Sequence, residues 1–105
     1  MRVLLVLLIA SGPISAEEDA ETRLLGTNKC VKCDLSNAEL EGAKLRRADF
    51  SGAYLYRANL EYADLRGANF TDVDLSNARL RGADLRNAIF NGAILKYTNF
   101  GDADL

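Results

Sequence analysis

The chain has 105 residues, a length that allows one small domain. Its 13 basic and 15 acidic residues leave a net charge of −2, which argues against a partner selected by strong overall charge. The sequence has no histidine and so lacks the commonest general base and the commonest metal ligand.

Residues 1–16 have the layout of a secretory signal peptide. Arg2 precedes an apolar run of 8 residues, Val3 to Ala10, and small residues lead to a cut after Ala16. A membrane-spanning helix needs about 20 apolar residues, so an uncleaved anchor is the weaker alternative. We therefore predict export to the periplasm, to the thylakoid lumen if the host is photosynthetic, or to the medium, with no membrane attachment after cleavage. Such compartments are oxidising.

Residues 17–29 are predicted to form an N-terminal capping segment with a short helix. The acidic residues between Glu17 and Glu21 suit the first turn of a helix, where the macrodipole favours negative charge. Leu24 and Leu25 are placed to cover the structure that follows, and Gly26 is placed to end the helix.

The only two cysteines, Cys30 and Cys33, are spaced C-x-x-C. This spacing occurs in thiol–disulfide redox sites, in half of a zinc site, and in local disulfides. A zinc site needs four ligands, and one copy of this chain offers two. The other two interpretations depend on the residues that follow.

From residue 33 onward the chain repeats in blocks of five. The third position of each block is Leu or Phe in 15 of 15 blocks, and the first is Ala in 12 of them. A period of five gives neither the stripe of an α-helix nor the alternation of a long strand. It is explained by two extended positions with inward side chains, followed by a turn that brings the next Ala inward.

The turns carry their own signature. Ten of the 14 second corners between Asn37 and Asp102 are Gly, Asn or Asp, the residue types that tolerate the positive φ of a type II turn. The other four corners are expected to adopt another turn type: Arg47, Arg57, Tyr62 and Tyr97.

Four turns in the same sense close one coil of four blocks, which predicts about 3.75 coils from the 15 blocks. Three sets of residues recur in every fourth block and are expected to stack in columns: Phe50, Phe70 and Phe90; Arg46, Arg66 and Arg86; Asp64, Asp84 and Asp104. The charged columns share a face. They are interpreted as a solvated ladder of ion pairs rather than as an anion-binding stripe.

The blocks A-(D/N)-(L/F)-x-x resemble the pentapeptide-repeat family from Cys33 to Leu105. The resemblance implies an all-β domain over residues 30–105, a right-handed quadrilateral β-helix whose interior is filled by the Leu/Phe and Ala positions. The best-known family function is mimicry of DNA to inhibit type II topoisomerases. With 11 acidic and 9 basic residues in 34–105, this chain lacks the negative field that such mimicry needs, so this function is an alternative only.

The repeat register also interprets the two cysteines. Counting back in fives places Cys30 on a Leu/Phe-type position, four blocks before Phe50, and makes Cys33 the first Ala-type position. The pair then occupies residues 1 and 4 of one turn, close enough for a disulfide. We predict a disulfide that clasps the capping helix to the first coil, with a thiol–disulfide redox protein as the second alternative.

The function predicted is that of a non-catalytic, exported interaction module without cofactor or metal, which binds a protein of unknown identity and no nucleic acid. No nucleophile–base pair or phosphate-binding loop supports an enzyme. The open C-terminal end is predicted to pair with a second copy or with another protein. The candidate interaction surface comprises Tyr54, Tyr56, Ile89, Ile94 and Leu105.

Overall fold

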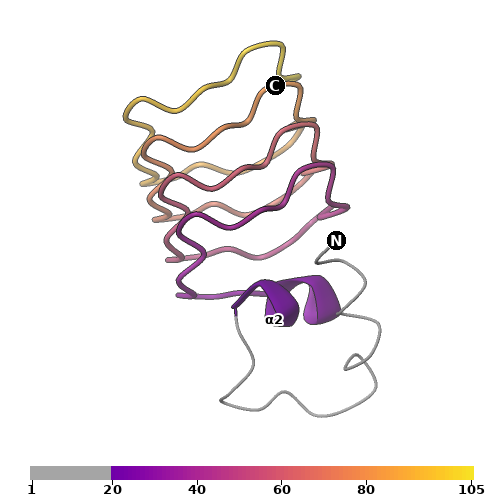
Figure 1. Cartoon of the computed structure of the whole chain (residues 1–105), viewed down its shortest axis with the longest axis vertical. Helices are drawn as coiled ribbons and strands as arrows, with labels where there is room; N and C mark the ends of the chain where they lie inside the picture. The colour runs from indigo at the N-terminus through magenta and orange to yellow at the C-terminus, as the bar shows by residue number, and fades with distance from the viewer. Residues whose placement is uncertain (1–19) are drawn as a thin grey trace.

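The computed structural model describes residues 20–105, so the predicted signal peptide and its cleavage site lie outside the described residues. A short helix, α2 (Ala20–Thr27), is followed by a chain that winds into stacked coils (Figure 1). Neighbouring coils in this part of the chain are joined by isolated β-bridges, and no longer strand forms there. No helix between residues 20 and 105 has the length and apolar character that a membrane crossing requires.

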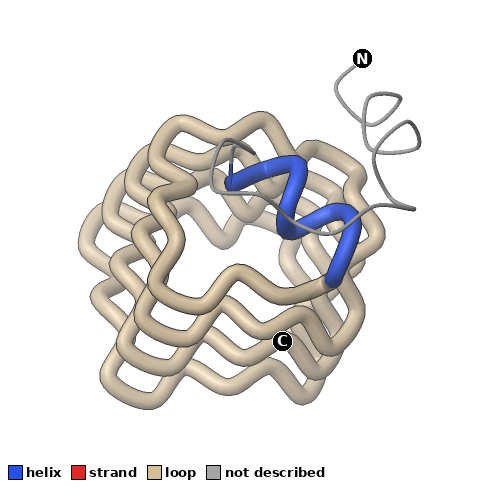
Figure 2. The backbone as a smooth tube through the Cα atoms, turned by 90° about the horizontal axis from the view of Figure 1, so that it is seen from below, coloured by secondary structure: helices blue, strands red, loops and turns tan. Residues whose placement is uncertain are grey.

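The register between coils is the same throughout the rod. Twelve parallel bridges each join residue i to residue i+20, from Lys29–Asp49 at one end to Asp84–Asp104 at the other. The predicted spacing of four blocks per coil is therefore confirmed. Viewed along the rod, the coils surround one common interior, and α2 lies across the end of the first coil (Figure 2).

Backbone hydrogen bonds connect each coil to both of its neighbours. The inward-facing Leu35 donates its N–H to the carbonyl oxygen of Tyr54 in the next coil at 2.7 Å. The outward-facing Tyr54 donates in the opposite direction, to the carbonyl of Cys33 at 2.8 Å. Each corner is closed by a further bond, such as that from Ala38 N–H to the carbonyl of Leu35 at 3.0 Å. These bonds satisfy the backbone without extended strands.

The interior consists of the Leu/Phe and Ala positions, as the repeat predicts. Every one of these side chains from Leu35 to Leu85 is buried. The phenylalanines stack directly: the ring centroids of Phe50 and Phe70, and those of Phe70 and Phe90, are 5.0 Å apart. Because each ring packs on the equivalent ring of the next coil, the interior forms one continuous apolar column.

The expectation of a different turn type at four corners is wrong. Arg47, Arg57, Tyr62 and Tyr97 have φ values of 59–61°, in the same left-handed region as the Gly and Asn corners. The reason lies in the coil contacts: the N–H of Arg47, for example, donates to the carbonyl of Arg66 at 2.8 Å. The stacking of the coils fixes the corner geometry, and the residue adopts a left-handed backbone conformation that costs about 1 kcal/mol.

The residue before each central Leu or Phe has a role that the sequence analysis missed. When it is Asp or Asn, its side-chain oxygen accepts the N–H of the residue two positions later, as Asp34 does from Ser36 at 3.0 Å and Asn69 from Thr71 at 3.0 Å. This arrangement is an Asx turn, in which the side-chain oxygen binds the backbone N–H of the first corner residue. The frequent Asp or Asn at this position of the repeat is the feature from which these turns could have been predicted.

The predicted capping helix is present, but it ends differently. Leu24 is fully buried against the first coil and Leu25 is partly buried. Gly26 lies inside the last turn, and Asn28 takes the left-handed conformation (φ 63°), with its N–H bonded to the carbonyl of Leu24 at 2.7 Å. Asn is the commonest substitute for Gly at such a C-terminal position.

A pair of glycine corners gives a test of side-chain stacking. Both Gly42 and Gly82 have positive φ, so we expect substitution by alanine to destabilise each by about 1 kcal/mol. A Cβ at Gly82 would additionally lie 2.5 Å from the ring of Tyr62, whereas a Cβ at Gly42 meets nothing within 4 Å. Gly82→Ala should therefore lower the free energy of unfolding, measured by urea denaturation, more than Gly42→Ala does. Adding Tyr62→Ala should remove this difference. Equal losses for the two single variants would contradict this packing.

Candidate interaction surface

Exposed aromatic side chains gather along one corner of the rod. Tyr54 pairs with Asp74, and Asp74 pairs with Ile94, so these three outward positions form one column. The exposed fractions of Tyr54 and Ile94 are 55% and 53%. Tyr56, 37% exposed, lies at the turn two residues after Tyr54. The structure thus places three of the five predicted surface residues together.

Two cations add to this surface. The guanidinium of Arg57 lies 5.2 Å from the ring centroid of Tyr56, and the ammonium of Lys96 lies 5.6 Å from that of Tyr97. These contacts hold each cation over an aromatic face. We call this surface the aromatic corner; it comprises Tyr54, Tyr56, Arg57, Ile94, Lys96 and Tyr97.

The remaining predicted residues lie elsewhere. Ile89 belongs to the column of Lys29, Asp49 and Asn69 on a different face. Leu95 and Leu105 occupy inward-type positions of the last coil, but they are 41% and 75% exposed. The same positions in the preceding coil, such as Leu85, are almost fully buried. In the described chain the last coil therefore presents an apolar end next to the aromatic corner.

The charged columns form the predicted ion-pair ladder. Arg66 lies between two carboxylates, 2.8 Å from Asp64 and 3.5 Å from Asp84. Arg86 lies in the same way between Asp84 at 2.6 Å and Asp104 at 3.5 Å. Because each cation bridges its own coil and the next, the two charges compensate along the whole face. The pKa of Asp84 is lowered chiefly by its hydrogen bond to Arg86, and the pKa of Arg86 is raised by the same contact.

The Asx turns make stability depend on pH. The hydroxyl of Ser51 donates to Asp49 at 2.6 Å, and this bond, with the Ser51 N–H, lowers the pKa of Asp49 below its ordinary value of 3.8. A carboxyl whose pKa is lower in the folded state contributes stability above about pH 4, and that stability is lost as the pH falls through the folded pKa.

We therefore expect Ser51→Ala to raise the pKa of Asp49 toward its ordinary value and to reduce the loss of stability between pH 4 and pH 2. Thr71→Val is the matched control, because Thr71 makes the same bond to the uncharged Asn69. NMR titration and urea denaturation across this pH range measure both effects. If Thr71→Val changed the loss of stability between pH 4 and pH 2 as much as Ser51→Ala does, the Asp49 carboxylate would not be the cause of that loss.

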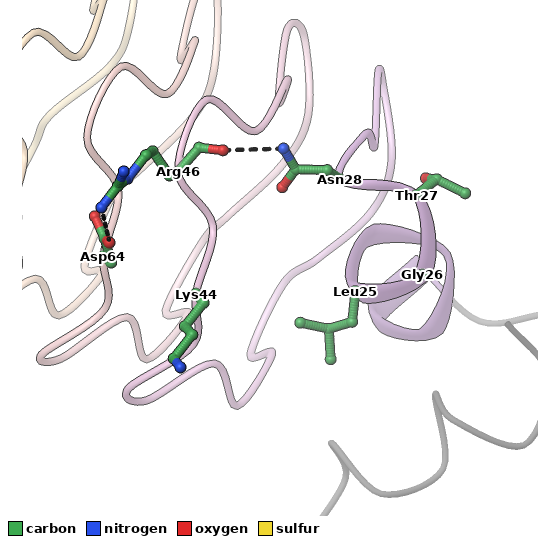
Figure 3. Close-up of a pocket in the computed structure, with 7 residues that line it drawn as sticks. All are labelled: Leu25, Gly26, Thr27, Asn28, Lys44, Arg46 and Asp64. Carbon is green, nitrogen blue, oxygen red and sulfur yellow. Dashed lines mark hydrogen bonds and ion pairs between the residues drawn. The ribbon is translucent and has the colours of Figure 1, made fainter.

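A recess of about 520 Å³ lies where the end of α2 meets the coils (Figure 3). The seven residues that line it are Leu25, Gly26, Thr27, Asn28, Lys44, Arg46 and Asp64. The guanidinium of Arg46 lies 3.5 Å from the carboxylate of Asp64, and the side-chain amide of Asn28 donates to the backbone carbonyl of Arg46 at 3.0 Å. The recess holds no nucleophile paired with a base. Residues 20–105 contain no group of three or more side chains suited to bind a metal.

The two cysteines form a disulfide, with their Cα atoms 5.2 Å apart. The Cys33 N–H donates to the Cys30 carbonyl at 3.3 Å, and the second corner, Lys32, has a φ of 59°. The corner predicted from the repeat register is therefore present. Both side chains are buried, 1% exposed for Cys30 and 5% for Cys33.

Comparison with known proteins gives a consistent result. A family model described as pentapeptide repeats matches residues 33–72 and 68–105. Two crystal structures of pentapeptide repeat proteins are similar at 36% identity: Rfr23 from the cyanobacterium Cyanothece 51142, with a TM-score of 0.71, and alr5209 from Nostoc PCC 7120, with a TM-score of 0.73. The matches cover 72% and 79% of this chain, but 52% and 69% of those proteins, so the chain spans about half of Rfr23. No curated protein matched the sequence.

Proposed function

This chain belongs to the pentapeptide-repeat family, whose members form right-handed quadrilateral β-helices and are generally non-enzymatic interaction modules. From this premise we propose that it is an exported adaptor that binds a protein partner through the aromatic corner. Tyrosine and arginine are enriched among the residues that dominate protein interfaces. The apolar end of the last coil adjoins the corner and enlarges the contact surface.

The observation that carries the proposal is the exposure of large side chains at one corner. Tyr54, Ile94 and Tyr97 are 55%, 53% and 76% exposed, and two cations lie over the rings of Tyr56 and Tyr97. At other corners, the side chains of Arg47 and Tyr62 each lie over a glycine of the next coil, Gly67 and Gly82. Exposed tyrosines grouped with arginine are typical of residues that contact a partner protein.

Export follows from the signal-peptide layout of residues 1–16 and is supported by a disulfide, a bond that persists in oxidising compartments. The mature chain would begin at Glu17. Mimicry of DNA finds no support on the charged face, where the arginines of the ion-pair ladder neutralise the aspartates.

The proposal is tested with mature protein 17–105 as bait in an extract of the host's exported proteins. A triple variant, Tyr54→Ser, Tyr56→Ser and Tyr97→Asn, should lose a partner that wild type retains. Tyr62→Ser is the control, since it removes a tyrosine of similar exposure from another corner. A partner that survives the triple variant, or that is also lost with Tyr62→Ser, would show that the aromatic corner is not the binding surface.

Self-association through the C-terminal end is the proposed second use of the same region. Pairing of two copies would bury Leu95 and Leu105 together with the partly buried Phe100. Sedimentation should detect a dimer that Leu105→Ser weakens. A strict monomer at high protein concentration would exclude this arrangement.

A further inference from the structure

The Cys30–Cys33 disulfide lies in an asymmetric environment beneath α2. Nη1 of Arg23 is 3.9 Å from Sγ of Cys33, whereas Sγ of Cys30 is 3.5 Å from the carbonyl oxygen of Ala20. Both neighbours belong to α2, and Leu24 of the same helix is fully buried. The sulfur of Cys33 therefore lies next to a cation, and the sulfur of Cys30 lies next to a carbonyl oxygen.

These neighbours would act in opposite directions on the two thiols of the reduced protein. A guanidinium favours a thiolate, so it lowers the pKa of Cys33. A carbonyl oxygen accepts a hydrogen bond from a protonated thiol and repels an anion, so it keeps Cys30 neutral. Nε of Arg23 is buried without a hydrogen-bond partner. A partly buried guanidinium interacts more strongly with a nearby anion than one in bulk water does.

We propose that the disulfide is a reducible site for small thiols, in which Arg23 makes Cys33 the leaving group and α2 controls access. The thiolate of a small monothiol attacks Sγ of Cys30, the Cys30–Cys33 bond breaks, and its electron pair remains on Cys33 beside Arg23. A second thiolate then attacks the small-molecule sulfur of the mixed disulfide and releases Cys30, which takes a proton from water. Two monothiols are oxidised to one disulfide, and the protein disulfide is reduced to two thiols.

Access to the attacked sulfur depends on the helix. Cys30 is 1% exposed and lies against the first residue of α2, so an incoming thiol reaches it only when the first turn of α2, at Ala20, moves away from the sulfur while Arg23 stays beside Cys33. The reactivity of the disulfide therefore depends on the docking of the cap, and reduction removes the bond that constrains the corner beneath it. This inference does not depend on the proposed binding partner.

The test is redox equilibration of the mature protein with reduced and oxidised glutathione at pH 7.5. Arg23→Gln should make the disulfide about tenfold harder to reduce, which corresponds to ~30 mV for two electrons, because the Cys33 thiolate of the reduced protein loses its neighbouring cation. Arg23→Lys should restore most of the difference. Lys44→Gln is the matched control, because Lys44 is a cation near the end of α2 without a contact to either sulfur.

A second readout separates charge from folding. The pKa of Cys33 is measured in a Cys30→Ser background by thiolate absorbance against pH, and it should rise when Arg23→Gln is added. Ala20→Gly should speed the reaction of the disulfide with glutathione, because it loosens the first turn of α2 over Cys30 while leaving Arg23 and Leu24 in place. The proposal is overturned if Arg23→Gln leaves the redox equilibrium and the Cys33 pKa unchanged. It is also overturned if Ala20→Gly shifts the equilibrium as far as Arg23→Gln does while Arg23→Lys fails to rescue.

Discussion

Leu65→Asp is expected to prevent folding of the repeat domain. Leu65 is fully buried in a central coil, and its N–H is bonded to the carbonyl of Asp84 at 2.8 Å, so its side chain has no route to solvent. A buried, unpaired carboxylate costs several kcal/mol, in addition to the ~2–5 kcal/mol lost when a buried leucine is removed. This sum is comparable with the whole stability of a small domain. Circular dichroism and urea denaturation of the mature chain measure the effect.

The neighbouring Arg66→Ala variant is the control. Arg66 is central to the ion-pair ladder, but its side chain is 35% exposed, and exposed ion pairs contribute little. We expect a loss of about 1 kcal/mol or less. Equal stability of Leu65→Asp and Arg66→Ala would mean that the inward and outward positions of the repeat are assigned wrongly.

Phe70→Ala is expected to destabilise the domain by about 3–5 kcal/mol. Phe70 is fully buried, and its ring is stacked between those of Phe50 and Phe90 with centroids 5.0 Å away on both sides. Its removal leaves a cavity in the middle of the column, which the coils cannot close because their backbones are hydrogen-bonded on both sides. The free energy of unfolding is the quantity to compare.

Phe100→Ala provides the same chemical change at the apolar end. Phe100 is only partly buried and meets Phe90 edge-on, with ring centroids 6.2 Å apart. Its loss should cost clearly less than that of Phe70, since less apolar surface returns to water. A larger loss at Phe100 would indicate that the end of the last coil is covered, as it would be in a dimer. Repeating the measurement at several protein concentrations distinguishes these cases.

The candidate site was only partly accessible from the sequence. The outward positions of Tyr54 and Ile94 follow from the register, because blocks that return to the same face in every coil must align in columns. The contacts of Arg57 with Tyr56 and of Lys96 with Tyr97 do not follow from it, since they depend on side-chain conformations. The contact of Arg23 with Cys33 also lay beyond sequence reasoning, because the docking direction of a short helix depends on the coil below it.

The corners show how the repeat and the stacking share control of the fold. Gly, Asn and Asp at ten corners predict a positive φ from local preference alone. Arg57 and Tyr97 have no such preference, and local reasoning assigned them incorrectly. Their conformation comes from the chain around them, because every corner of a stacked coil must follow the same path.

The sequence by itself determined the inward positions, the coil of four blocks and the place of the disulfide, because these follow from a strict period that allows only one register. The tertiary structure alone decided the shape of the irregular corners, the end of α2 at Asn28, and the unequal surroundings of Cys30 and Cys33. These features depend on contacts between segments that no local pattern specifies, and their energies of about 1 kcal/mol are outweighed by the stacking of the coils.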